Sequence, residues 1–446
     1  MLGGWRLFAA PLGWKPDKEP NLVFGVISDT HVRANRKGTF AGDSPRRYLD
    51  AALGYFCRQN VDAVVHLGDM AHNGQVEAMK LHAEAWRKAF PGDRADDGRP
   101  VTRLFVTGNH DVEGFTYSNY IDRIIPDKEK QKSHLLITDM VGNWERIWGE
   151  KYEPVWHKEV KGYHFYGRNW DVPENDFASF VKEDSGRRGL AGGEVPVFLL
   201  SHRRLFYKFR KSVSLFRNAV AFFGHCHYSA ANWNTIYGCK TFPSVQCPSC
   251  HAAGQGVSLV EDAYITKAPI AYSRESVGDG RQGFVVRVYD DMLTIERREF
   301  SEGGSLGADW VMQFGMTPHP FSKGELKKVI GEPQFGKNVE LKVESVKLES
   351  GEVAVKVSIP LADGNPDSRV YAYEVVVVGD EGTPKLHKAV YAAGCNMGIG
   401  HEPNGGVTTL DIPKSELPPG KTLTFAVRPL SSLGTSGKAI ATEFKA

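Results

Sequence analysis

Apolar runs alternate with amphipathic helical stretches through the first 200 residues of the chain. The apolar runs over residues 21–27, 61–67, 103–107 and 195–200 predict buried strands, and the alternating run over 162–169 predicts another. Apolar positions at helical spacing predict helices over 44–56, 75–90 and 173–183. This rhythm favours right-handed strand–helix–strand units, and therefore an α/β fold.

The pattern changes in the second half of the chain. Residues 284–300 predict an antiparallel hairpin with Asp290 and Asp291 at its turn. Prolines and glycines over 315–335 indicate a linker, and six or seven short strand-like runs beyond it predict a β-sandwich. We therefore expect a leader over 1–20, an α/β domain over 21–314, a linker over 315–335 and a β-sandwich domain over 336–446.

Composition excludes few classes of protein. Hydrophobic residues make up 41% and charged residues 24%, as in ordinary globular proteins. Lys plus Arg number 55 against 53 for Asp plus Glu, so net charge favours neither a nucleic-acid nor a membrane partner. No apolar run approaches the roughly 20 residues that span a bilayer. Residues 1–20 lack the basic and apolar regions of an intact signal peptide, and six cysteines leave the redox compartment open.

Five apolar runs end in residues of the types that bind metals: the four named above and a fifth, AVAFF, over residues 219–223. In chain order the polar residues at these ends are Asp29 and His31, then Asp69, then Asn109, His110 and Asp111, then His202, and finally His225 and His227. Ligands bind beyond the carboxyl ends of the strands in open α/β sheets. Carboxylate, amide and imidazole groups suit divalent ions of the first transition series. The sequence therefore predicts a metal site assembled from strand tips.

These blocks occur in order across residues 25–227 and resemble the calcineurin-like metallophosphoesterase superfamily. The resemblance implies a four-layer sandwich of two mixed sheets flanked by helices. It also implies two divalent ions, Mn, Fe, Zn or Co, with a metal-bound hydroxide attacking phosphorus. By the same resemblance, the first metal has the ligands Asp29, His31 and His227. The second has Asn109, His202 and His225, while Asp69 bridges the two and His110 faces the phosphate as the catalytic residue.

Strand geometry adds an expectation about the last block. Residues i and i+2 on a strand end point to the same side, so His225 and His227 should serve one cluster and Cys226 should face the core. Asp111 is expected to cap the following helix or to support His110.

His72 departs from the family pattern. Protein phosphatases of the superfamily have an aspartate at this position, which orients the catalytic histidine, and purple acid phosphatases have a metal-binding tyrosine. His72 could orient His110, reach the first metal, or be a plain surface histidine.

Three further features leave alternatives open. Arg203 and Arg204 could hold substrate phosphate, beside Asn109 and His110, or form a solvated basic turn. The segment Cys247–His251 matches haem-attachment and dithiol spacings, but it also fits an ordinary loop beside the site. The aromatic insertion over 112–160 favours a flap packed on the body over substrate contact.

The overall pattern looks most like bacterial exported phosphoesterases, with a fibronectin type III-like sandwich at the C-terminus. We expect a hydrolase of small phosphomonoesters or phosphodiesters, exported to the periplasm or beyond, whose oligomeric state the sequence leaves open. The alternatives are a nuclease of the DNA-repair branch, which a basic stripe would favour, and a non-catalytic metal-dependent adaptor.

Overall fold

The computed structural model describes most of the chain. The described residues are 7–9, 16–117, 120–205, 216, 218–237, 242–253, 270–271, 277–314, 326–328, 330–365, 368–380, 382, 384–418 and 421–445.

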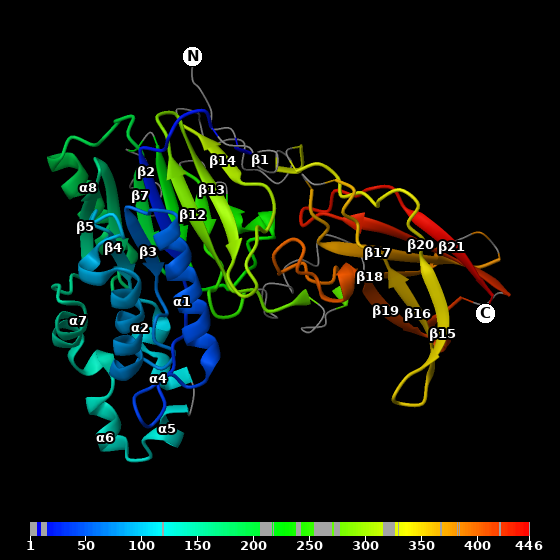
Figure 1. Ribbon diagram of the computed structural model, residues 1–446, viewed down its shortest axis with the longest axis horizontal. Helices are drawn as coiled ribbons and strands as arrows, with labels where there is room; N and C mark the ends of the chain where they lie inside the picture. The colour runs from blue at the N-terminus through cyan, green and yellow to red at the C-terminus, as the bar shows by residue number, and fades with distance from the viewer. Residues whose placement is uncertain are drawn as a thin grey trace.

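Two β-sheets face each other in the N-terminal part of the chain (Figure 1). The first has the strand order β1-β14-β13-β12-β2-β3-β4. Its strands are β1 Leu7–Ala9, β2 Leu22–Ile27, β3 Ala63–Leu67, β4 Thr102–Val106, β12 Gln282–Val288, β13 Met292–Glu299 and β14 Trp310–Gln313. Strands β2, β3 and β4 are parallel, and the predicted hairpin is confirmed as β12 and β13.

The second sheet has the order β5-β6-β7-β8-β10-β9. Its strands are β5 Val155–Val160, β6 Tyr163–Arg168, β7 Val197–Ser201, β8 Ala219–Phe223, β9 Ile236–Tyr237 and β10 Ser244–Gln246. Strands β6, β7, β8 and β10 run parallel. The five strands predicted over residues 21–200 are therefore confirmed, with ends shifted by one or two residues.

The core between the sheets explains why these strands are continuously apolar. The ring of Phe24 on β2 meets Phe165, Phe198 and Phe222 of the second sheet, with ring centroids 5.4, 5.1 and 6.0 Å apart. All four side chains are buried. A strand covered on both faces shows no polar alternation, which is the pattern of the sequence.

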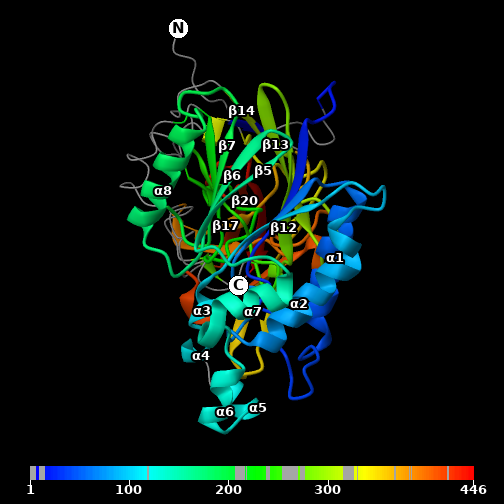
Figure 2. The same ribbon diagram turned by 90° about the vertical axis from the view of Figure 1, so that its left-hand side faces the viewer.

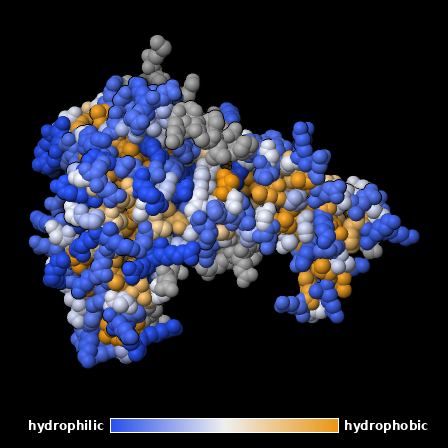
Figure 3. Space-filling view, viewed as in Figure 1, coloured by the Kyte–Doolittle hydropathy of each residue, from blue (hydrophilic) through white to orange (hydrophobic). Residues whose placement is uncertain are grey.

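Helices cover the outer faces of both sheets. Figure 2 shows α1 Asp43–Arg58 and α2 Val76–Ala89 on one side and α8 Glu174–Arg187 on the other. The predicted four-layer sandwich is confirmed. None of the described helices is long and apolar enough to cross a membrane. The face shown in Figure 3 is mainly hydrophilic over this part of the molecule.

The insertion after β4 is mostly helical. It contains α3 Asn109–Val112, α4 Gly114–Tyr117, α5 Tyr120–Ile124, α6 Lys128–Ser133, the 3₁₀ turn Leu136–Asp139 and α7 Met140–Trp148. Trp144, Trp148, Tyr152 and Trp156 are buried against the sheet and α2, so these aromatic residues serve packing rather than substrate contact.

The C-terminal part forms two further sheets, as the sequence predicts for a β-sandwich. One has the order β15-β16-β19 and the other β11-β18-β17-β20-β21. Their bounds are β11 Ile270–Ala271, β15 Lys342–Lys347, β16 Val353–Ile359, β17 Ala372–Val378, β18 Pro384–Tyr391, β19 Thr408–Pro413, β20 Thr422–Leu430 and β21 Ile440–Lys445. Further 3₁₀ turns are Pro91–Asp93, Trp233–Thr235, Pro403–Gly406 and Lys414–Glu416. The fibronectin type III likeness and the domain boundaries stay predictions.

The loop that follows β8 contacts this C-terminal part. The backbone N–H of Trp233 donates to Ser432 Oγ at 3.0 Å. Gln282 of β12 accepts from the backbone N–H of Ala230 at 2.8 Å and donates to the carbonyl of Asn396 at 2.6 Å. The loop just beyond His227 is therefore hydrogen-bonded to strand β12 and to the C-terminal part of the chain.

Candidate metal centre

The predicted ligands come from both sheets and lie at one edge, beyond the carboxyl ends of the parallel strands. Asp29 and His31 follow β2, and Asp69 follows β3. The backbone N–H groups of Asp29 and His31 donate to the carbonyls of Gly68 and Asp69, each at 2.9 Å. The backbone N–H of His225, beyond β8, donates to Asp29 Oδ2 at 3.0 Å, which joins the second sheet to the first.

Five of the predicted ligands have left-handed backbone conformations. Their φ angles are 53° for Asp29, 45° for His31, 57° for Asp69, 75° for His225 and 56° for His227. Such a conformation costs a residue other than glycine about 1–3 kcal/mol and is concentrated at functional sites. Five residues with this conformation at the strand ends indicate that the backbone turns there so that their side chains lie close together.

The strand argument for His225 and His227 is wrong. Strand β8 ends at Phe223, and both histidines lie in the left-handed turn beyond it. They join different clusters, as the ligand sets implied by the resemblance have it, and the intervening Cys226 is partly exposed rather than buried in the core.

The first cluster consists of Asp29, His31 and His227. The Nε2 atoms of the two histidines lie 3.1 Å apart, and Asp29 Oδ1 lies 3.2 Å from His227 Nε2 and 3.9 Å from His31 Nε2. Asp29 Oδ2 accepts from Ser28 Oγ at 2.5 Å, whereas Oδ1 is buried without a hydrogen-bond donor among the described residues. An orphaned carboxylate oxygen beside two ring nitrogens fits a bound cation.

The second cluster contains Asp69, Asn109, His202 and His225. Asn109 Oδ1 lies 3.0 Å from both His202 Nε2 and His225 Nδ1, and these two nitrogens are 3.2 Å apart. The Nδ1–H of His202 donates to the carbonyl of Leu67 at 2.6 Å, which leaves Nε2 as the ligand atom.

Asp69 lies between the clusters. Its Oδ2 is 3.2 Å from His202 Nε2 and 3.8 Å from His31 Nε2, while Oδ1 accepts from the backbone N–H of His110 at 2.7 Å. This position corresponds to the bridging role that the resemblance implies.

The charges of the site also favour a cation. Burial opposes protonation of His202, yet the carboxylates of Asp69 and Asp29 raise its pKa to about 9. Against the effect of burial, the imidazoles of His227 and His202 hold the pKa of Asp29 well below its usual range. The buried carboxylates therefore attract positive charge, and the nitrogen and oxygen atoms around them suit divalent ions.

His110 lies outside these two clusters but forms a third candidate group with His31 and His72, whose ring nitrogens lie within 4.8 Å of one another. Its Nδ1–H donates to the backbone carbonyl of His72 at 2.6 Å. Asp111 does not support His110: its two oxygens accept the backbone N–H groups of Ala71 and Gly108, at 2.7 and 2.9 Å. Asp111 therefore caps the short helix α3 and ties it to the loop after β3.

His72 is not a plain surface histidine. Its ring stacks on His110 with centroids 5.1 Å apart, and its Nδ1 lies 3.2 Å from His31 Nδ1. Burial, followed by the nearby charge of Arg33, lowers the pKa of His72 to about 3, so the ring is neutral. It orients His110 through its backbone carbonyl, while its ring reaches the first cluster.

The geometry of this centre agrees with the comparison to protein families. Residues 22–229 match the family model of the calcineurin-like phosphoesterases. This segment is similar to a calcineurin-like phosphoesterase domain. The match covers slightly less than half of the chain, and comparison with curated proteins finds no match.

Solved structures with low sequence identity resemble parts of this chain. A dimetal phosphatase from Danio rerio is 12% identical, with a TM-score of 0.38, over 66% of this chain and 100% of the other. Purple acid phosphatase PPD1 from yellow lupin (Lupinus luteus) is 10% identical, with a TM-score of 0.40, over 67% of this chain and 54% of its own. Vps29 from Chaetomium thermophilum is 10% identical, with a TM-score of 0.29, over 66% of this chain and 99% of its own.

The segment Cys247–His251 is part of the wall of the candidate metal centre. Ser249 Oγ donates to the carbonyl of Asp29 at 2.9 Å, and the His251 ring lies 5.8 Å from that of His31. Cys247 and Cys250 are free thiols, and burial raises the pKa of Cys250 to about 12. The segment is a loop beside the site, as one sequence alternative has it, and the sequence analysis did not single out His251.

Trp170 is a second residue that the sequence analysis missed. Its ring centroid lies 5.7 Å from those of His202 and His225. The guanidinium carbon of the exposed Arg203 lies 4.4 Å from the centroid of the Trp170 ring. Its position in the sequence could have indicated this role. Trp170 follows strand β6, which is parallel to β7 and ends at the same edge of the sheet as the metal ligands.

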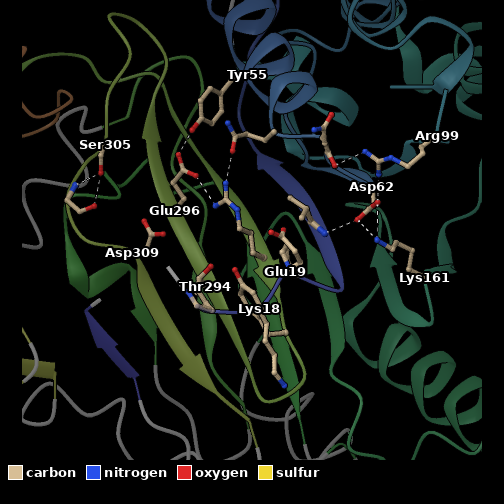
Figure 4. Close-up of a pocket in the computed structure, with 18 residues that line it drawn as sticks. Lys18, Glu19, Tyr55, Asp62, Arg99, Lys161, Thr294, Glu296, Ser305 and Asp309 are labelled. Carbon is tan, nitrogen blue, oxygen red and sulfur yellow. Dashed lines mark hydrogen bonds and ion pairs between the residues drawn. The ribbon is translucent and has the colours of Figure 1, made fainter. Parts of the chain in front are cut away.

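A cleft of about 710 Å³ lies at the opposite ends of these strands (Figure 4). Two ion pairs join charged residues of its lining: Arg287 with Glu296 at 2.9 Å, and Arg99 with Asp62 at 2.8 Å. We assign function to the strand tips rather than to this cleft, because the groups of described residues that could hold a metal ion lie at the strand tips.

Proposed function

We propose that the protein is a dimetal hydrolase of small phosphoesters. The observation that carries the proposal is the pair of clusters that face each other across Asp69, with an orphaned Asp29 oxygen between ring nitrogens. Asp29, His31 and His227 would hold one divalent ion, and Asn109, His202 and His225 the other. Such ions lower the pKa of a water molecule and neutralise charge on phosphoryl oxygens.

The chain's own residues complete the reaction site. Nδ1 of His110 donates to the His72 carbonyl, so Nε2 is the ring atom that would act on the substrate. That atom can protonate the leaving oxygen or stabilise charge on the phosphoryl group. Asn109 turns Oδ1 to the histidines of the second cluster, which leaves its amide N–H groups for a phosphoryl oxygen.

The proposal is tested by comparing bis-p-nitrophenyl phosphate with p-nitrophenyl phosphate in the presence of Mn(II), with Asp69→Asn as the blank. We expect turnover of at least one ester well above the blank. Faster turnover of the diester assigns a phosphodiesterase, and faster turnover of the monoester a phosphatase. Cleavage of neither ester above the blank contradicts the proposal and favours the adaptor alternative.

A further inference from the structure

We propose that Trp170 and Arg203 form a subsite for a second anionic group of the substrate. The inference rests on the proposed function and names its substrate class: phosphoesters whose non-reacting part carries a further carboxylate, phosphate or similar group.

Trp170 is a fixed wall of the metal centre on the side of the second cluster. Its backbone N–H donates to Thr107 Oγ1 at 3.1 Å, and its indole N–H donates to Glu113 Oε1 at 3.0 Å. These two bonds join the loop after β6 to the end of β4 and to the insertion. The ring thereby stays against the imidazoles of His202 and His225, at 5.7 Å from each.

Arg203 presents an exposed cation beside the ring of Trp170. It follows His202 directly, and its guanidinium carbon lies over the Trp170 ring, 4.4 Å from the ring centroid. Among the residues that the structure describes, no Asp or Glu lies within ion-pair distance of it. A guanidinium over an aromatic ring can keep its N–H groups for a carboxylate or phosphate, which it binds in bidentate geometry.

The position of this cation separates it from the reacting phosphoryl group. The phosphorus belongs at the metal clusters, where Asn109 and His110 are within reach. Trp170 touches both the ligand imidazoles and Arg203, so the stack holds the guanidinium beside the centre rather than in it. An anion bound there would belong to the part of the substrate that extends past His225.

Charge favours the same assignment. With the carboxylates of Asp29 and Asp69 counted against two divalent ions, the guanidinium of Arg203 adds to a net positive charge, which the single charge of a phosphodiester would balance only in part. A second anionic group would compensate Arg203 directly. The competing explanation is a solvated basic turn, which would give no discrimination between charged and neutral substrates.

The test uses two p-nitrophenyl phosphodiesters that differ only in charge, with a 3-carboxypropyl or a 3-carbamoylpropyl group as the second ester. The readout is the ratio of their kcat/KM values, because both release the same leaving group. We expect the wild-type enzyme to prefer the carboxylate about tenfold, as a charge-assisted hydrogen bond allows. Arg203→Met should bring the ratio close to one, mainly through KM of the carboxylate ester.

Arg187→Met is the matched control, because it removes the same charge from helix α8, where Arg187 pairs with Asp184. It should keep the wild-type ratio. A wild-type ratio near one overturns the subsite, and so does an Arg203→Met enzyme that slows on both esters equally. Cleavage of neither ester by the wild-type enzyme, with bis-p-nitrophenyl phosphate also left intact, contradicts the proposed function itself.

Discussion

Asp69→Asn is expected to lower kcat for the preferred phosphoester by at least about 10³-fold, or roughly 4 kcal/mol of transition-state stabilisation. Asp69 Oδ2 lies between the two clusters, 3.2 Å from His202 Nε2 and 3.8 Å from His31 Nε2. Asparagine keeps the shape of the side chain and can still accept the N–H of His110. It removes the negative charge that holds two cations together, so metal affinity should fall with turnover.

Asp62→Asn is the control for this prediction. Asp62 is also buried, and it pairs with Arg99 and Lys161 at the opposite ends of the strands. Its replacement should cost stability but leave kcat of the folded enzyme within about twofold, because the charge is remote from the centre. If Asp69→Asn retains more than a tenth of wild-type kcat, the bridging role is wrong.

His110→Asn is expected to lower kcat by about 10²- to 10⁴-fold while the protein keeps its metal content. The ring lies outside the two clusters on either side of Asp69, although it forms a further group with His31 and His72, and its Nδ1–H is committed to the His72 carbonyl at 2.6 Å. Loss of Nε2 therefore removes proton transfer or charge stabilisation at the phosphoryl group without opening a metal cluster. The measurement is steady-state turnover beside metal content by mass spectrometry.

The variant His72→Asn tests whether the ring or the backbone carbonyl of His72 orients His110. The substitution removes the imidazole but keeps the backbone carbonyl that accepts from His110 Nδ1. We expect a loss of kcat of no more than about tenfold, well below that of His110→Asn. Equal losses in the two variants would show that the His72 ring, rather than its carbonyl, supports catalysis.

Much of the site could be predicted from sequence because parallel strands bring their carboxyl ends to one edge. Asp29, Asp69 and Asn109 each follow a buried strand of the first sheet, and His202 and His225 follow strands of the second. A local pattern, an apolar run that ends in a possible metal ligand, therefore predicted that residues far apart in the sequence meet at one site.

The details that could not be predicted depend on backbone conformation beyond the strand ends. His225 and His227 lie in a left-handed turn, so the strand geometry expected for them does not apply, although the ligand sets implied by the resemblance separate them as the structure does. The carbonyl of His72 as the partner of His110 has no side-chain signature at all. Trp170 enters the site through loop packing, which neither periodicity nor spacing reports.

In the fold, too, elements with a local sequence pattern were predicted and elements that depend on distant contacts were not. The strands β2, β3, β4, β6 and β7 have strong apolar runs and were predicted to within two residues. Strand β1, by contrast, lies in the predicted leader and pairs with β14, about 300 residues along the chain. Such pairing depends on an open sheet edge that only the folded domain creates.

The most direct test of the central claim is a titration of metal-free protein with Mn(II), followed by turnover of the preferred p-nitrophenyl ester. The two clusters across Asp69 predict that activity is absent without metal and reaches its maximum at two equivalents of Mn(II) per chain. Full activity with one equivalent, or undiminished activity after chelation, would contradict a dimetal phosphoesterase.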